Sequence, residues 1–118
     1  MDVLLVEDDA LIREMLAEFL SDAGLRITAI ADPGEALALI STALPLAVLV
    51  TDVNLGAATD GLALAVAAHR CRPSIRVVII SGRPDNFHGH ALHPSDRFLP
   101  KPFVAEDLLR AIREPAAA

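Results

Sequence analysis

Acidic side chains follow two of the apolar runs in this sequence. The run VLVT at residues 48–51 leads directly into Asp52, and the run at residues 2–6 leads into Glu7, Asp8 and Asp9. Several carboxylates close to one another repel, so either one takes up a proton or a cation shares them. Hard oxygen ligands with room for water suit Mg²⁺ better than zinc. Asp8 and Asp9 have an ordinary alternative role as helix caps, whereas Asp52, at the end of a buried run, has no such duty.

A hydroxyl and a lysine stand at the ends of two later runs. Ser81 closes the run at residues 76–81, and Lys101 follows the run at residues 97–100. Lys101 is the only lysine among ten basic residues, and a compact ammonium is favoured where one charge must reach a phosphate or carboxylate in a tight space. The Lys101–Pro102 bond is a candidate cis peptide that could aim the lysine inward. A solvated lysine and a plain strand-end hydroxyl are the alternatives. Together with the acids, these groups could bind a cation and move a phosphoryl group onto Asp52.

Short aliphatic runs alternate with helical patterns along the chain. Length and β-branching predict strands at residues 2–6, 26–31, 46–51, 76–81 and 97–100, the second being the most polar and expected at an edge. This alternation predicts parallel strands joined by right-handed crossovers, with helices on both faces of the sheet. In such sheets the functional site lies beyond the carboxyl ends of the strands, where strand order reverses. The acids, the hydroxyl and the lysine all fall at those ends.

The spacing of apolar residues predicts four regular helices. The first is capped by Asp8 or Asp9 and stops at Gly24, and its apolar face is Ile12, Met15, Leu16, Phe19 and Leu20. The second opens on the capping-box pattern DPGE at residues 32–35, and its apolar face is Ala36, Leu37, Ile40 and Leu44. The third runs from Gly61 to His69. The last spans residues 103–114, with Val104, Leu108 and Ile112 on one face.

Residues 82–97 break this rhythm. The stretch GRPDNFHGHALHPSDR carries two prolines and two glycines, so a loop is predicted there, with at most a short, irregular helix that would be the fourth in chain order. A metal site at His88, His90 and His93 is the alternative to solvated side chains, but loop histidines without a carboxylate or cysteine partner are usually solvated. Cys71, at a helix end, is expected to be inert.

Length and composition narrow the class of protein. With 118 residues, of which 53% are hydrophobic, the chain suffices for one domain with a layered core, and no linker divides it. No apolar run approaches the length of a membrane-spanning helix, and the start MDVLLVEDD lacks the basic residues of a signal peptide. A single cysteine excludes an internal disulfide and fits a cytoplasmic location. The net charge of −6 argues against direct nucleic-acid binding.

The functional residues form a specific combination when they are taken together. An acidic pair follows the first strand, Asp52 the third, Ser81 closes the fourth, and KPF follows the fifth. This pattern resembles the receiver domain of two-component response regulators over nearly the whole chain, so residues 1–118 are expected to form a single receiver domain. The resemblance implies an α/β fold: a doubly wound, flavodoxin-like sheet of five parallel strands in the order 2-1-3-4-5, with helices on both faces.

The resemblance also implies a role for each matching residue. Asp52 would be the phosphoacceptor. Glu7 and Asp8 match the metal-binding pair that, with Asp52 and the backbone carbonyl of Asn54, would bind Mg²⁺. Asp9 is left as the helix cap.

Four further roles follow from position in the family. Ser81 matches the phosphate-sensing hydroxyl and Lys101 the phosphate-pairing lysine. Phe98 falls where the family places a switch aromatic, although a core phenylalanine in an edge strand is an equal alternative. Asn54 and Arg83, two residues beyond the acceptor and the hydroxyl, hold positions that tune the lifetime of the phosphoryl group.

On this interpretation the chain is a switch rather than an enzyme. It would accept a phosphoryl group from a histidine kinase or a histidine phosphotransfer protein, with Mg²⁺ as cofactor, and signal to a downstream protein by changing conformation. Two features depart from the family. Gly56 stands where proline is usual, in a loop one residue longer, and the fourth helix, part of the usual signalling face, is degraded. No effector domain follows residue 114, and EPAAA is either a native tail or the cut end of a larger protein.

Three other functions use parts of the same pattern. A phosphatase of the haloacid dehalogenase type needs a second acid two residues after its nucleophile, where this chain has Asn54, and a cap domain for which there is no room. A flavodoxin-like binder needs hydroxyls and glycines after the first strand, where EDD would repel a phosphate. A receiver fold that serves only for docking is disfavoured by the complete set of acids, Ser81 and Lys101.

Overall fold

Five parallel strands form one sheet in the order β2-β1-β3-β4-β5. The computed structural model describes residues 2–42, 44–53, 61–81 and 96–114. The strands are β1 (Asp2–Val6), β2 (Arg26–Ile30), β3 (Val48–Asp52), β4 (Arg76–Ser81) and β5 (Arg97–Pro100). The helices are α1 (Ala10–Asp22), α2 (Pro33–Ile40), α3 (Gly61–Cys71) and α4 (Ala105–Arg113). The doubly wound, flavodoxin-like order predicted from the sequence is therefore confirmed, with the polar strand β2 at an edge.

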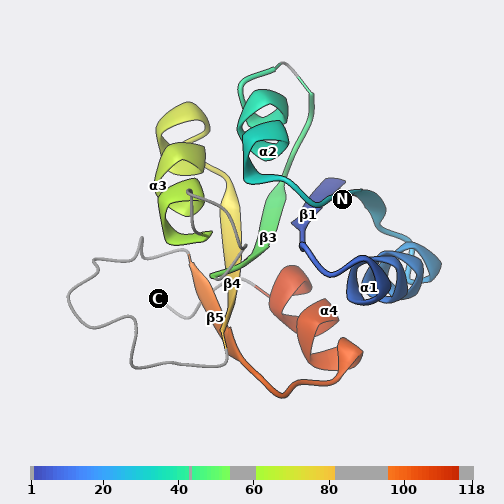
Figure 1. Cartoon of the computed structure of the whole chain (residues 1–118). Helices are drawn as coiled ribbons and strands as arrows, with labels where there is room; N and C mark the ends of the chain where they lie inside the picture. Colours follow the sequence, from blue (N-terminus) through green and yellow to red (C-terminus); the bar gives the residue numbers. More distant parts are fainter. Residues whose placement is uncertain (1, 43, 54–60, 82–95, 115–118) are drawn as a thin grey trace.

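Helices cover both faces of the sheet (Figure 1). One apolar layer joins α2 and α3 to the sheet through Leu4, Leu49 and Val77. The other joins α1 and α4 to the sheet through Val3 and Val50 and their neighbours. The central strands are buried on both faces, which is why they read as continuous aliphatic runs in the sequence. Within the described ranges, no helix has the length and apolar character needed to cross a membrane.

Local signals fix where the helices begin and end. The Oδ1 atom of Asp9 accepts hydrogen bonds from the N–H groups of Leu11 and Ile12 at 3.0 and 3.1 Å, so Asp9 is the cap of α1. Gly24, at a φ of +95°, takes the left-handed conformation that ends this helix. The side chain of Asp32 caps α2 by accepting from the N–H of Gly34 at 3.1 Å.

Several predicted boundaries and faces are corrected by the structure. α2 ends at Ile40, so Leu44 lies beyond the helix and is exposed. The hydroxyls of Ser41 and Thr42 donate to backbone carbonyls of the last turn and end the helix there. Val104 is exposed because it precedes α4 as its N-terminal cap residue rather than lying on the apolar face.

Other corrections concern α1, α3 and two of the strands. Met15, predicted in the core, is exposed on α1. α3 continues to Cys71, two residues past the predicted end. β2 ends at Ile30, and β3 is shifted to Val48–Asp52, so Asp52 is the last residue of the strand and pairs with β4.

Arginine side chains hold the carboxyl ends of three helices. Arg72 donates to two carbonyls at the end of α2, at 2.6 and 2.9 Å. Arg76 donates to two carbonyls at the end of α4, at 2.5 and 3.1 Å, and Arg113 donates to the carbonyl of Ala23 after α1 at 2.8 Å. These contacts lie at the amino ends of the strands, away from Asp52, and each satisfies backbone carbonyls that a helix end leaves without partners.

Candidate functional site

The predicted functional residues that the structure describes lie at the carboxyl ends of the strands. Glu7 directly follows β1, whose neighbour β3 ends in Asp52, while Ser81 ends β4 and Lys101 follows β5. Glu7, Asp52 and Ser81 are buried, with exposed fractions of 7%, 6% and 0%. Burying ionisable groups is costly unless they are paired, so the contacts that each one makes decide what the site can do.

Asp52 and Lys101 form an ion pair. The Nζ atom of Lys101 lies 2.5 Å from Oδ2 of Asp52, and the backbone N–H of Lys101 donates to the carbonyl of Ser81 at 2.8 Å. The Lys101–Pro102 bond is cis, as expected. Burial alone would lower the pKa of Lys101, but the hydrogen bond and negative charge of Asp52 outweigh it and raise the pKa. Lys101 therefore presents an ammonium group to the buried carboxylate at neutral pH.

Gly61 brings the start of α3 against the backbone of Asp52. Its N–H donates to the carbonyl of Val53 at 2.9 Å, and a Cβ atom at this position would lie 2.1 Å from the carbonyl oxygen of Asp52. Only glycine fits such an approach without a shift of the backbone. From the sequence, Gly61 is predicted only as the start of a helix, and its place soon after Asp52 is the signal that could have indicated this contact.

Glu7 is the second buried acid of the site. Burial first, then a hydrogen bond with the side chain of Asp8 and the negative charge of Asp52, raise the pKa of Glu7 from 4.5 to about 7. The N–H of Asp9 and the charge of Lys101 act in the opposite direction. Without a cation, Glu7 therefore holds its proton up to about pH 7 instead of losing it near pH 4.5, which is one of the two outcomes expected when carboxylates repel.

The acids provide oxygen donors of the kind that Mg²⁺ prefers. Glu7 is buried and carries the raised pKa, Asp8 is exposed beside it, and Asp52 lies on the adjacent strand. Within the described ranges, no three His, Cys, Asp or Glu side chains are grouped closely enough to make a complete metal site. Mg²⁺ usually keeps several waters and takes one or two carboxylates from the protein, so this donor set fits it.

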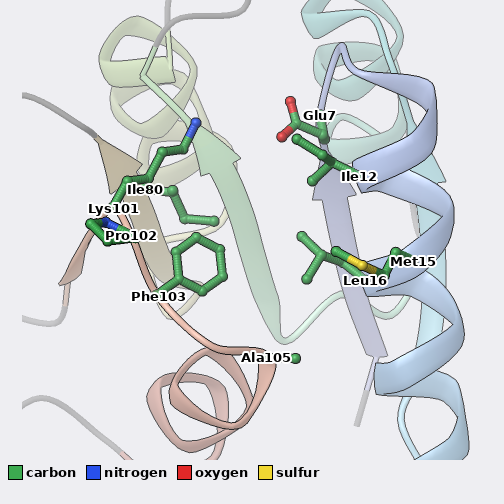
Figure 2. A pocket seen from close by; sticks show the side chains of 9 residues that line it. All are labelled: Glu7, Ile12, Met15, Leu16, Ile80, Lys101, Pro102, Phe103 and Ala105. Carbon is green, nitrogen blue, oxygen red and sulfur yellow. The ribbon is translucent and has the colours of Figure 1, made fainter.

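An apolar depression, here called the α1 hollow, opens beside these charges. It has a volume of about 440 Å³ and is lined by Glu7, Ile12, Met15, Leu16, Ile80, Lys101, Pro102, Phe103 and Ala105. Figure 2 shows the α1 side chains on one side of the hollow and Ile80 and Phe103 on the other, with Glu7 and Lys101 at one end. The hollow was not predicted from the sequence, because the apolar spacing of the helix places Met15 on the face toward the core.

Of the remaining residues singled out in the sequence, the structure describes Phe98 and Cys71 but not the others. Phe98 is half-buried and packs against the layer of α2 and α3. Cys71 is exposed, and its Sγ atom lies 3.9 Å from the hydroxyl of Ser41. Outside the described residues lie Asn54, Gly56, Arg83, His88, His90 and His93, together with the predicted fourth helix.

The chain belongs to the response regulator receiver domain family, whose family profile matches residues 3–113. Membership confirms the family predicted from the motifs. Receiver domains of this family are phosphoacceptor switches of phosphorelay signalling rather than classical enzymes, and they generally bind Mg²⁺.

Individual relatives agree with this assignment. The regulatory protein VirG of Agrobacterium tumefaciens is 36% identical over 115 residues, which cover 94% of this chain and 42% of that protein. The chain therefore spans less than half the length of the curated relatives that it matches. A response regulator receiver protein from Sinorhizobium medicae superposes with a TM-score of 0.87 at 26% identity, covering 95% of this chain and 90% of that one. A Vibrio cholerae chemotaxis protein gives a TM-score of 0.81 at 28% identity, covering 95% of each chain.

Proposed function

We propose that residues 1–118 act as one receiver domain that accepts a phosphoryl group on Asp52. The donor is a phosphohistidine on a histidine kinase or a histidine phosphotransfer protein, and the setting is the cytoplasm. The observation that carries the proposal is the 2.5 Å ion pair between the buried carboxylate of Asp52 and the ammonium of Lys101. A carboxylate held in this way has a fixed direction of attack and a cation beside it for the oxygens that arrive.

The residues of the chain assist a direct transfer. A carboxylate oxygen of Asp52 attacks phosphorus in line, so that a P–O bond forms while the P–N bond to the donor histidine breaks and its electron pair stays on the imidazole ring. Lys101 neutralises charge on the transferred group, and the buried hydroxyl of Ser81 then binds one of its oxygens. When bound by Glu7, Asp8, Asp52 and the Asn54 carbonyl, Mg²⁺ supplies positive charge that screens the carboxylates from the phosphoryl oxygens.

The conformational change begins when Lys101 and Ser81 give up their contacts in the unmodified protein and bind oxygens of the phosphoryl group. In the unmodified protein Lys101 is paired with Asp52, whereas an acyl phosphate offers oxygens farther from the strand end. Moving these contacts shifts the ends of β4 and β5, with Phe98 as the switch aromatic of β5. Asn54 and Arg83 tune how long the phosphoryl group survives.

The α1 hollow supports the approach of a protein donor from this side. Its lining is apolar next to Glu7 and Lys101, and Leu11 and Met15 are exposed on the same helix. Asp8, Asp9 and Glu14 add exposed negative charge nearby. A helix that carries apolar and basic side chains beside its phosphohistidine would complement this surface.

The test is phosphoryl labelling of the purified protein. Acetyl phosphate should label it only when Mg²⁺ is present, and Asp52→Asn should abolish the label. Asp32→Asn, an isosteric change at the cap of α2 outside the site, should leave labelling intact. Label that survives Asp52→Asn would show that the acceptor is a different residue. An unlabelled wild type would favour a docking module, and sustained hydrolysis of phosphomonoesters would favour a phosphatase.

A further inference from the structure

A histidine and an aspartate that are distant in the sequence meet between α3 and β5. The Nε2 atom of His69, in the last turn of α3, lies 2.7 Å from Oδ1 of Asp96, the residue that precedes β5. Their side chains are only 13% and 3% exposed. This contact is here called the α3–β5 brace. A carboxylate buried to this degree needs a close partner, so the contact resists separation far more than a surface pair does.

Contacts at both ends of β5 add to its pairing with β4. It is an edge strand of four residues, hydrogen-bonded to β4, and none of its residues is fully buried. Its last residue is Pro100, which has no N–H to donate. The brace holds the start of the strand, and the contacts of Lys101 with Ser81 and Asp52 hold the residue that follows its end.

α3 links the brace back to the acceptor. The helix begins at Gly61, which lies against the backbone of Asp52, and its last turn carries His69. Contacts therefore run in a closed ring from Asp52 through α3 and the brace into β5, and from Lys101 back to the carboxylate of Asp52. In Figure 1, α3 and β5 both lie beside β4, α3 on one face of the sheet and β5 as its edge strand.

We propose that His69 is a positioning residue for Lys101. By fixing the start of β5 on α3 through Asp96, it sets where the strand delivers the lysine ammonium onto Asp52. The contact between Lys101 and Asp52, and the retention of a phosphoryl group there, depend on the brace. The second consequence rests on the proposed function, whereas the first concerns the unmodified protein alone.

The single lysine makes the first consequence directly measurable. Protein grown with lysine that is isotope-labelled only at the side-chain nitrogen gives one side-chain nitrogen signal by NMR, that of Lys101 Nζ. Asp52→Asn defines the position of this signal when the carboxylate charge is lost. In His69→Leu the signal should move toward the Asp52→Asn position. The Lys101 amide, which donates to Ser81, should exchange its hydrogen about tenfold faster or more, while the Val50 amide in central β3 keeps its rate.

Two variants separate positioning from general stability. His69→Gln keeps an N–H donor at the place of Nε2 and should restore both the signal and the exchange rate. Arg26→Leu breaks an ion pair at the start of the opposite edge strand β2 and should leave Lys101 unchanged. If His69→Leu does not fold because the buried Asp96 carboxylate loses this contact, His69→Leu/Asp96→Asn removes the charge and should show the same Lys101 shift.

The outcomes distinguish this proposal from the proposed function. An unchanged Lys101 signal and amide exchange rate in a folded His69→Leu protein would overturn the positioning role, even if its unfolding midpoint fell. With acetyl phosphate and Mg²⁺, the label on His69→Leu should decay several-fold faster than on the wild type, and an equal decay would overturn the second consequence. A wild type that takes no label would refute the proposed function, while the NMR result would still decide the role of His69.

Discussion

Glu7→Gln should stabilise the metal-free protein at alkaline pH and leave its stability almost unchanged in acid. The folded protein raises the pKa of Glu7 from 4.5 to about 7, mainly by burial, so it binds this proton more tightly than the unfolded chain does. The stability contributed by this proton is complete below about pH 4.5 and is lost as pH rises through about 7.

The size of the effect follows from the two pKa values. Each tenfold difference in proton affinity corresponds to about 1.4 kcal/mol, so ionising Glu7 in the folded protein costs about 3 kcal/mol. Gln keeps the volume of the protonated acid and can donate the hydrogen bond to Asp8. At about pH 8 the variant should therefore exceed the wild type by about 3 kcal/mol in free energy of unfolding, and the difference should vanish near pH 4.5.

Urea unfolding in the presence of EDTA measures this difference. Far-ultraviolet circular dichroism is the suitable probe, since the chain has no tryptophan. Comparing the two proteins at each pH cancels the titration of the groups that lie away from Glu7, and Glu18→Gln, at an exposed glutamate of α1, serves as the matched control. Stability curves of the wild type and Glu7→Gln that stay parallel from acid to alkaline pH would refute the reasoning. Mg²⁺, which favours the ionised acid, should stabilise the wild type more than the variant.

Three further changes test other parts of the structure. Gly61→Ala should lower the free energy of unfolding in the same urea assay by about 1–3 kcal/mol, because the added Cβ would meet the Asp52 carbonyl. Gly34→Ala is the control and should lower it by less than about 1 kcal/mol, because the added Cβ would meet only the side chain of Asp32, which can move. Met15→Asp should slow phosphoryl transfer from a cognate kinase about tenfold while labelling by acetyl phosphate stays normal, and equal losses with both donors would contradict a docking role for the α1 hollow. Arg113→Leu should destabilise the protein by about 1–2 kcal/mol, since the carbonyl after α1 loses a charged donor, and an unchanged urea midpoint would contradict that role.

Much of the fold was predictable because its signals are local. Aliphatic runs of strand length alternate with amphipathic segments, and right-handed crossovers leave few ways to arrange them. Residue type marked Gly24 as the end of α1 and limited its cap to Asp8 or Asp9, of which Asp9 is the cap. The closeness of Asp52 and Lys101 was predictable as well, because the carboxyl ends of parallel strands lie on the same side of the sheet.

The features that could not be predicted depend on neighbours distant in sequence. Met15 fits the apolar spacing of α1, but the helix faces a hollow at that position instead of a closed core. The place of Gly61 soon after Asp52 does not by itself predict that a backbone carbonyl occupies the space of a methyl group there. The contact of His69 with Asp96 joins residues 27 positions apart, and neither belongs to a recognisable motif.

The three arginines at the carboxyl ends of the helices divide the molecule into two halves with different chemistry. Arg72, Arg76 and Arg113 bind backbone carbonyls at the amino ends of the strands, where neither a cation nor a phosphoryl group at Asp52 would touch them. Protonation, cation binding and acyl phosphate formation would all act at the opposite end, where the only lysine stands. The arginine contacts at the amino ends of the strands therefore stay the same while the contacts of Lys101 and Asp52 at the carboxyl ends change. A partner that binds both ends would detect the movement of one relative to the other.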